Sequence, residues 1–283
     1  MRRLALGLVL VLALAACGEE ERADPPKERP IDALAAAAAK SAAAGTVRMS
    51  GTMDMTTGGE RVALEMTGVA DLRANASATR TEVANDSKRQ AGFPQEMVMA
   101  DSKQWMSSPE IAANLPKGRR WTMTDLAQVW NELGLDPDRV ARTAAADPVE
   151  MMRTLGKTGQ ARRVGVETID GVRTTRYAAA IDIRKALEAA RTRKGADVDK
   201  AIAGMAGLLG NRMPVEVWVG PDGLIHRQKL EFRMQSGIMT GGGTATIDMT
   251  DYGADVTIEP PAGKDVVDVT EQIKAVFTRA FAP

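Results

Sequence analysis

Apolar and polar residues alternate strictly in the segment that begins near residue 46. Positions 47, 49, 51, 53 and 55 carry Val, Met, Gly, Met and Met, whereas the positions between them are polar or charged. The same alternation runs from Val62 to Leu72, after a turn at residues 57–60. A period of two over two such stretches predicts an antiparallel β-hairpin with one apolar face and one solvated face.

Shorter stretches of the same kind follow, separated by the Asn, Asp, Ser, Gly and Pro residues that favour turns. The pattern predicts strands at residues 79–84, 97–106, 119–123, 161–169, 172–183, 213–219, 224–234 and 244–252. The pair Asp170-Gly171 is typical of a two-residue hairpin turn. The chain therefore contains at least two meanders of antiparallel strands.

Helical periodicity appears at the start, in the middle and at the end of the chain. Residues 32–44 are almost all alanine, the residue with the highest helix propensity, although a low-complexity linker is the alternative there. Four more helical patterns follow, and the aspartates at the start of the first two can cap a first helical turn. These patterns begin at Asp125, Asp147, Asp182 and Asp197, and a last one follows Thr270. The order of elements predicts an α+β fold with one large antiparallel sheet, which at eight or more strands tends to curl, and helices gathered on one side of it.

The first seventeen residues have the layout of a secretory signal. Arg2 and Arg3 precede an apolar run over residues 4–16, and the small residues of Leu14-Ala15-Ala16 stand before Cys17, the only cysteine in the chain. This resembles the lipobox of bacterial lipoproteins, in which the cysteine is acylated after cleavage. A plain secretory signal and a membrane-spanning helix are the alternatives, and the run is too short to cross about 30 Å of hydrocarbon.

We therefore expect three parts: a signal peptide over residues 1–16, a tether over 17–30 and a single domain over 31–283. The tether sequence after Cys17 is charged, contains prolines and has no large apolar residue, so it cannot bury enough surface to order itself. Fully extended, it reaches at most roughly 45 Å. This predicts a protein anchored by lipid on the extracytoplasmic face of the cell membrane.

The composition excludes several functional classes. Without the signal, 35 basic residues face 37 acidic ones, a net charge of −2 that argues against nucleic acid as a partner. With no second cysteine and with His226 as the only histidine, a metal site or a Ser-His-Asp triad is not expected, and no cofactor motif is complete. The Gly156-Lys157-Thr158 sequence lacks the first glycine of a phosphate-binding loop, because Met151 stands in its place. We expect a protein that is not an enzyme, has no cofactor and is a monomer.

Methionine is the unusual residue of this chain. Fifteen methionines follow Met1, against ten aromatic residues in all, and they recur on the predicted apolar faces. Any one of them can be ordinary core filling, but methionine is flexible and polarizable and suits cavities for variable apolar ligands. The residues expected to line such a cavity are Met49, Met53, Met55, Leu64, Met66, Met99, Val215 and Val217.

Three segments together resemble a known family. They are residues 170–187 (DGVRTTRYAAAIDIRKAL), 213–232 (MPVEVWVGPDGLIHRQKLEF) and 251–270 (DYGADVTIEPPAGKDVVDVT). With the lipobox and the alanine-rich helix, they are similar to actinobacterial lipoproteins of the LppX and LprG type, which are related in fold to the periplasmic lipoprotein carrier LolA. The resemblance implies a curved half-barrel with helices across its concave side, an acylated Cys17 and a lipid or lipidated ligand.

Two functions remain open from the sequence. The first is a membrane-anchored carrier or binding protein for a lipid or another apolar ligand. The second is an anchored sensor or interaction protein on the same scaffold, without a large cavity, which exposed aromatic side chains at Trp130, Phe277 or Phe281 would favour. A surface hydrolase is least supported, since no nucleophile and base can be assembled around one histidine.

Overall fold

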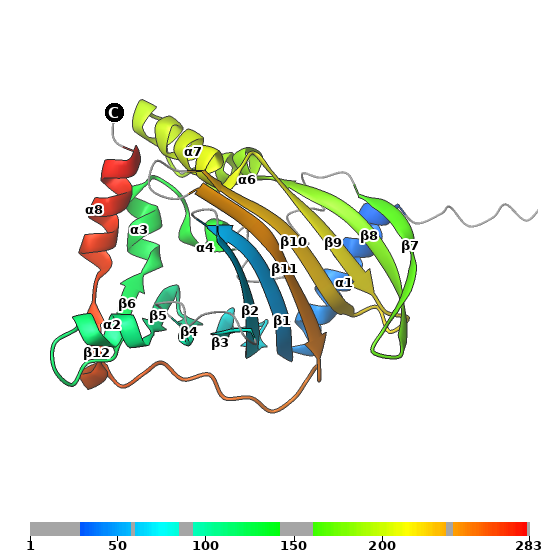
Figure 1. Ribbon diagram of the computed structural model, residues 1–283. Coiled ribbons are helices and arrows are strands. Elements are labelled where there is room, and N and C mark those ends of the chain that lie inside the picture. Colours follow the sequence, from blue (N-terminus) through cyan, green and yellow to red (C-terminus); the bar gives the residue numbers. More distant parts are fainter. Residues whose placement is uncertain (1–28, 58–59, 85–92, 142–160, 236–239, 282–283) are drawn as a thin grey trace, which may run out of the picture.

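The computed structural model describes residues 29–57, 60–84, 93–141, 161–235 and 240–281. Twelve strands in these ranges form one sheet in the order β12-β6-β5-β4-β3-β2-β1-β11-β10-β9-β8-β7. The strands are β1 (Thr46–Thr57), β2 (Glu60–Asp71), β3 (Ala76–Val83), β4 (Gln95–Ala100), β5 (Lys103–Ser107), β6 (Trp121–Asp125), β7 (Arg162–Ile169), β8 (Val172–Asp182), β9 (Arg212–Val219), β10 (Ile225–Gln235), β11 (Thr240–Thr250) and β12 (Val266–Asp268). Figure 1 shows the sheet curving around a concave side.

Seven α-helices lie within the described residues. They are α1 (Pro30–Ala44), α2 (Pro109–Asn114), α3 (Leu126–Glu132), α4 (Pro137–Ala141), α6 (Ile183–Ala189), α7 (Ala196–Leu209) and α8 (Thr270–Phe281), with a short 3-10 turn at Gly263–Asp265. The α+β class and the large curved sheet expected from the sequence are confirmed. Side chains of α3, α4, α6 and α7 reach the hollow on the concave side of the sheet.

The first predicted hairpin forms over almost its whole length. β1 pairs with β2 from Thr46↔Asp71 to Thr57↔Glu60, and Met53 lies opposite Leu64. Val47, Met49, Val62 and Leu64 are buried, whereas the intervening side chains of β1 are exposed. The alternation in the sequence therefore identifies the two faces of this hairpin correctly.

Several boundaries differ from the sequence-based expectation. The single strand expected over residues 97–106 is two strands, because Asp101 and Ser102 adopt positive φ angles that turn the chain back. The sheet also has one parallel pair, because β12 joins β6 with Val266 opposite Trp121. Helix α1 begins at Pro30, two residues earlier than expected, since proline suits the first turn of a helix. The helix expected after Asp147 lies outside the described residues.

Glycine allows the central strands to approach one another closely. Gly51 on β1 lies opposite Ile247 on β11 and Met66 on β2, on the concave face. A Cβ atom at position 51 would lie 2.3 Å from the carbonyl oxygen of Thr246. No side chain fits there without displacing the backbone, so glycine allows the strands to pack tightly at this point.

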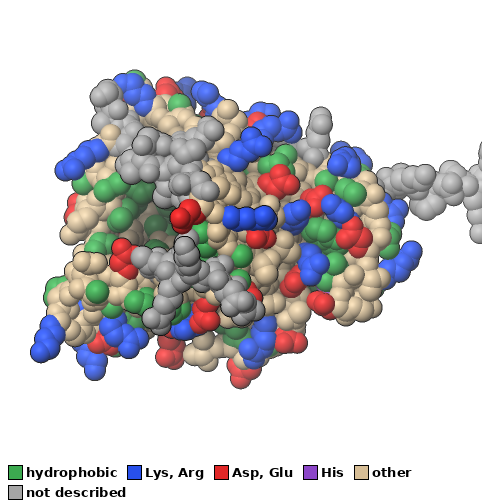
Figure 2. All heavy atoms as spheres, in the orientation of Figure 1, with side chains coloured by type: hydrophobic (Ala, Val, Ile, Leu, Met, Phe, Trp, Pro, Cys, Tyr) green, Lys and Arg blue, Asp and Glu red, His purple; other side chains and the backbone are tan. Residues whose placement is uncertain are grey.

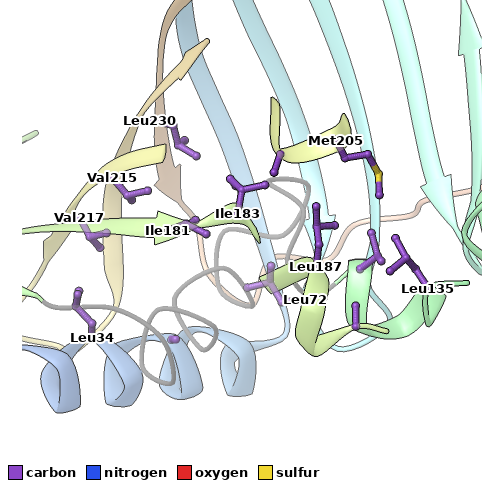
Figure 3. Packing of buried hydrophobic residues seen from close by; sticks show 14 of the residues in the cluster. Leu34, Leu72, Leu135, Ile181, Ile183, Leu187, Met205, Val215, Val217 and Leu230 are labelled. Atoms are coloured by element: carbon purple, nitrogen blue, oxygen red, sulfur yellow. The ribbon is translucent and has the colours of Figure 1, made fainter. Parts of the chain in front are cut away.

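The core lies between the sheet and the helices that cover its concave side. α1 contacts β7, β9 and β10, and its Leu34 is fully buried in a cluster that includes Val217. In Figure 3 Leu34 points from α1 toward the strands, and Leu187 and Met205 come from the helices on the other part of the same face. The buried Ser41 of α1 accepts a hydrogen bond from the backbone N–H of Ile225, at 3.1 Å, which fixes the helix to the start of β10.

The expected signal peptide, Cys17 and the tether up to residue 28 lie outside the described residues. Within the described ranges, no helix is long and apolar enough to cross a membrane.

Candidate ligand-binding cavity

A cavity of about 470 Å³ lies on the concave side, between the sheet and the helices. Fourteen residues line it: Met53, Met66, Trp130, Val140, Ile183, Leu187, Met205, Leu209, Met213, Leu230, Phe232, Arg233, Ala245 and Ile247. In Figure 2 the molecule is hollowed on one side, where green hydrophobic side chains gather. The volume lies within the range of about 300–1,000 Å³ that is common for pockets of small ligands.

The sheet provides the floor of the cavity through strands that are far apart in the sequence. Met53 on β1 lies opposite Ala245 on β11, and Ala245 lies opposite Leu230 on β10. Met66 on β2 and Ile247 on β11 flank Gly51 in the next row. Because directly paired residues share a face, these side chains point to the same side of the sheet.

The helices provide the opposite wall. Ile183 and Leu187 lie one turn apart on α6, and Met205 and Leu209 lie one turn apart on α7, so each pair projects from one face of its helix. The side chain of Asp182 accepts a hydrogen bond from the backbone N–H of Lys185, at 3.0 Å, which caps the start of α6.

An aromatic pair supports the wall at α3. The ring of Trp130, which lines the cavity, contacts that of Phe277 on α8 edge to face, with the ring centroids 6.1 Å apart. Both side chains are partly buried against the core, whereas the side chain of Phe281 is not described. Neither Trp130 nor Phe277 is therefore the exposed aromatic residue that an interaction surface would require.

Arg233 is the only ionisable residue among those that line the cavity. The other lining side chains are aliphatic, aromatic or thioether groups, and four of them are methionines. Such a surface offers few hydrogen-bonding partners to a polar solute and favours an apolar ligand. Within the described ranges no cluster of His, Cys, Asp and Glu residues could hold a metal ion.

A network of charged groups on β7 to β11 lies on the opposite, convex face. The guanidinium of Arg176 donates hydrogen bonds to Glu167 at 2.7 Å and to Glu216 at 2.6 Å, and it lies 5.2 Å from the ring centre of Trp218. The indole N–H of Trp218 donates to Glu167 at 2.9 Å. The hydrogen bonds from Trp218 and Arg176 hold the pKa of the Glu167 carboxyl below its usual value. Arg227 pairs with Asp248 in the same region.

The structure places the eight residues expected at a ligand site in different surroundings. Met53 and Met66 line the cavity. Met49, Leu64, Val215 and Val217 are buried on the same concave face, where they pack beneath the helices or beside the cavity. Met55 is partly exposed near the end of β1. Met99 borders a separate small hollow near Ala70 and Ser77.

None of the cavity residues that come from the helices was among those expected at the ligand site. Met205 and Leu209 carried a usable signal, because they share the apolar stripe of α7 with Val198 and Ile202. Trp130 likewise lies on the apolar side of α3. The sequence shows that these stripes face the sheet, but it does not show which of their residues remain in contact with a hollow.

The comparisons with known proteins concern the chain as a whole. No family model matches it. An uncharacterized 31.2 kDa protein of Streptomyces griseus, from the rplA-rplJ intergenic region, is 26% identical over 267 residues, which cover 88% of this chain and 82% of that protein.

Three solved structures have a similar fold. LprF from Mycobacterium bovis is 15% identical, with a TM-score of 0.41 over 83% of this chain and 97% of that chain. The Mycobacterium tuberculosis lipoprotein LppX is 13% identical, with a TM-score of 0.41 over 81% and 99%. A LolA superfamily protein from Nitrosomonas europaea is 7% identical, with a TM-score of 0.28 over 81% and 96%. These are the fold groups that the sequence resemblance named, and the likeness concerns the fold alone.

Proposed function

We propose that this chain is an extracytoplasmic lipoprotein, anchored through acylated Cys17, that binds a lipid or another apolar ligand between its sheet and its helices. The observation that carries the proposal is the cavity of about 470 Å³, whose lining is apolar apart from Arg233. Protein interiors are usually close-packed and leave few apolar voids of this size, so core packing alone does not account for the cavity. The lipobox around Cys17 supports the anchoring part.

Four flexible methionines in the lining support a ligand of variable shape, such as an acyl chain. Met53 and Met66 extend from the floor, Met205 extends from α7, and Met213 lies at the start of β9. An unbranched thioether side chain can change rotamer to follow different chains at small cost. The hollow needs no catalytic group for such a role.

A charge introduced into the floor tests the ligand site. The Met53→Glu protein should bind an apolar dye such as N-phenylnaphthylamine with at least tenfold lower apparent affinity, because a carboxylate is costly to bury without a partner. The fluorescence of the bound dye measures this affinity. Thr52→Glu is the matched control: Thr52 is the neighbouring residue on β1, and its exposed side chain points to the other face. Equal dye binding by the two folded variants would contradict a ligand site in this cavity.

Anchoring needs a separate measurement. Mass spectrometry of the mature protein from its native host should find residues 1–16 absent and two acyl chains on Cys17, and Cys17→Ser should move the protein from the membrane to the soluble fraction. Two chains are expected because a single chain holds a protein to a bilayer only marginally. If Cys17 is unmodified in a protein that still binds the dye, the proposed anchor is contradicted and the proposed ligand site stands.

A further inference from the structure

The last strand of the sheet, β7, exposes apolar side chains to solvent. Val164 and Val166 are each 39% exposed, and among the described residues the other large apolar side chains that are exposed are Leu209 and Val276. β7 pairs only with β8 in the described sheet, so its other edge has no partner strand there. The register shifts between Arg163 and Gly165, so that Val164 lies in an irregularity that interrupts the edge.

Two arginines lie beside these valines. Arg163 is opposite Tyr177 and Val166 is opposite Thr175, and Arg173 lies two residues before Thr175 on β8. Since paired residues share a face and every second residue of a strand does so, Arg163, Val166 and Arg173 project to the same side. We call Arg163, Val164, Val166 and Arg173 the β7 patch.

The β7 patch carries uncompensated positive charge. Both arginines are exposed, and neither forms an ion pair with any residue in the described part of the chain. Glu167, the acidic residue of β7, lies opposite Thr174 and therefore faces the other side, where Arg176 binds it. Arg176 and Arg227 of the convex face are paired with carboxylates, whereas the two arginines of the β7 patch are not.

The chain enters the domain close to this patch. Helix α1 contacts β7, β9 and β10, and its later residues Lys40 and Ser41 lie at the turn between β9 and β10. Its first turn therefore lies toward β7, at the side of the sheet where Figure 1 shows β7 and β8. Only the residues 18–28 separate Cys17 from the first described residue, Arg29, a span of at most roughly 40 Å.

We propose that the β7 patch is the surface that this lipoprotein lays on an anionic lipid bilayer, which orients the domain and its cavity relative to the membrane. The proposal rests on the acylation of Cys17 put forward above. Arginines near an anionic surface each gain favourable electrostatic energy, and the two valines can enter the interface between headgroups and acyl chains. Because two acyl chains already hold the protein, the patch needs only to select an orientation.

The tether is a less suitable occupant of the patch. It is acidic, with Glu19, Glu20, Glu21, Asp24 and Glu28 against Arg22 and Lys27, so it could neutralise the arginines. It contains no apolar residue larger than proline, however, and cannot cover Val164 and Val166. A second copy paired along the edge of β7 would have to accommodate the irregularity at Val164, which is a feature that protects edge strands from such pairing.

The test places a fluorescent label on the patch of the mature, acylated protein. Acylation consumes the only natural cysteine, so Val166→Cys provides a single thiol for a bimane label, and Val276→Cys provides a matched exposed site on α8. The proteins are reconstituted in vesicles of phosphatidylglycerol and phosphatidylcholine in equal amounts. We expect the label at residue 166 to be shielded from aqueous iodide and quenched by spin-labelled lipid, and the label at residue 276 to show the reverse. Equal behaviour of the two labels in vesicles would overturn the proposal.

The same labels on the soluble Cys17→Ser protein identify a different occupant. Without vesicles both labels should be open to iodide. Shielding of residue 166 in a monomer would mean that the tether covers the patch, and shielding only in a dimer would mean that a second copy does. Either result would overturn docking on a bilayer while leaving dye binding in the cavity, and therefore the proposed ligand site, unaffected.

Charge substitutions supply a second measurement. Arg163→Gln with Arg173→Gln should lower the ratio of docked to undocked protein by roughly 25-fold, from about fivefold for each basic residue near an anionic surface. Replacing phosphatidylglycerol by phosphatidylcholine throughout should have a similar effect on the unsubstituted protein. A label at residue 166 that stays shielded in both experiments would contradict an anionic bilayer as the partner.

Discussion

At the scale of single residues, the close approach of strands at Gly51 shapes the concave face. The position lies between Met66 and Ile247, two residues of the cavity floor. A side chain there would have to displace the backbone at Thr246, because the distance from a Cβ atom to that carbonyl oxygen would be 2.3 Å. The close packing of the strands beneath the cavity thus depends on the absence of a side chain at this position.

Gly51→Ala should therefore lower the free energy of unfolding by about 1–3 kcal/mol, the usual cost of forcing extra atoms into a packed site. Gly207→Ala in α7 is the control, because nothing lies within 4 Å of a Cβ atom there. Alanine at that helical position should raise the stability by about 0.5–1 kcal/mol. Urea denaturation of the three proteins measures both changes, and equal stability of the two variants would contradict this account of the close approach at Gly51.

The network at Glu167 makes a small part of the stability depend on pH. Its carboxyl accepts hydrogen bonds from Trp218 and Arg176, which lower its pKa in the folded state. A group with a lowered pKa contributes its full stabilisation above its unfolded value, about 4.3 for glutamate, and loses it as the pH falls through the folded value. The contribution is modest because Glu167 is exposed and solvent screens the pair.

Glu167→Gln should accordingly lower the Tm at pH 7 and have progressively less effect as the pH falls from about 4.3. Thermal unfolding followed by circular dichroism from pH 7 to pH 3 gives the difference in Tm between the two proteins. Glu259→Gln, in the segment after β11, is the control: its side chain is exposed and forms no ion pair or hydrogen bond within the described residues, so the difference in Tm should stay near zero throughout. A difference that grows in acid would show that the carboxylate of Glu167 does not stabilise the fold.

At the scale of elements, α1 is held by one large apolar side chain, Leu34, and a stripe of small residues. Leu34, Ala37, Ala38 and Ser41 are buried, which brings the helix backbone close to the strands. The same stripe explains why an alanine-rich segment belongs to the domain and is not a linker. The helix closes the part of the concave side that lies away from the cavity.

Ala38→Asp should cost several kcal/mol or prevent folding, because it buries a charge in a fully buried position. Ala39→Asp, one residue further along the same helix, is exposed and should change the stability by no more than about 0.5 kcal/mol. Denaturation of the two variants, which have the same composition, distinguishes a packed helix from a linker. Equal stability would contradict the packing of α1.

At the scale of the whole molecule, the cavity should couple stability to ligand. A ligand that binds only the folded protein stabilises it by about 2.7 kcal/mol at 100 times its Kd. For a domain of this size that corresponds to a rise of roughly 5–10 °C in Tm. The protein stripped of bound lipid should therefore melt at a lower temperature than the protein as purified from its host.

Differential scanning calorimetry of the stripped protein, with and without lipid extracted from the host membrane, measures the rise in Tm. Thr52→Glu should keep the shift and Met53→Glu should lose it. If the stripped and the purified protein melt together and added lipid changes neither, the hollow does not hold a host lipid under these conditions.

The sequence by itself determines much of the local structure of this protein. It also predicts export and acylation, and these stay predictions. Alternation identifies which side chains of β1 and β2 share the apolar face, because the period of a strand is fixed by its backbone. The aspartates before Leu126 and Ile183 mark true helix starts, since their side chains accept hydrogen bonds from the first turn. The lipobox-like sequence around Cys17 can be recognised because all its features lie within seventeen residues.

Only the tertiary structure decides where the apolar face is left uncovered. Met49 and Met53 have the same pattern in the sequence, yet Met49 is buried and Met53 faces the cavity. The difference depends on the pairing of β1 with β11, about 200 residues later, and on where α6 and α7 cross the sheet. Periodicity fixes which way a side chain points, whereas what it meets there depends on contacts between distant segments, which no local pattern contains.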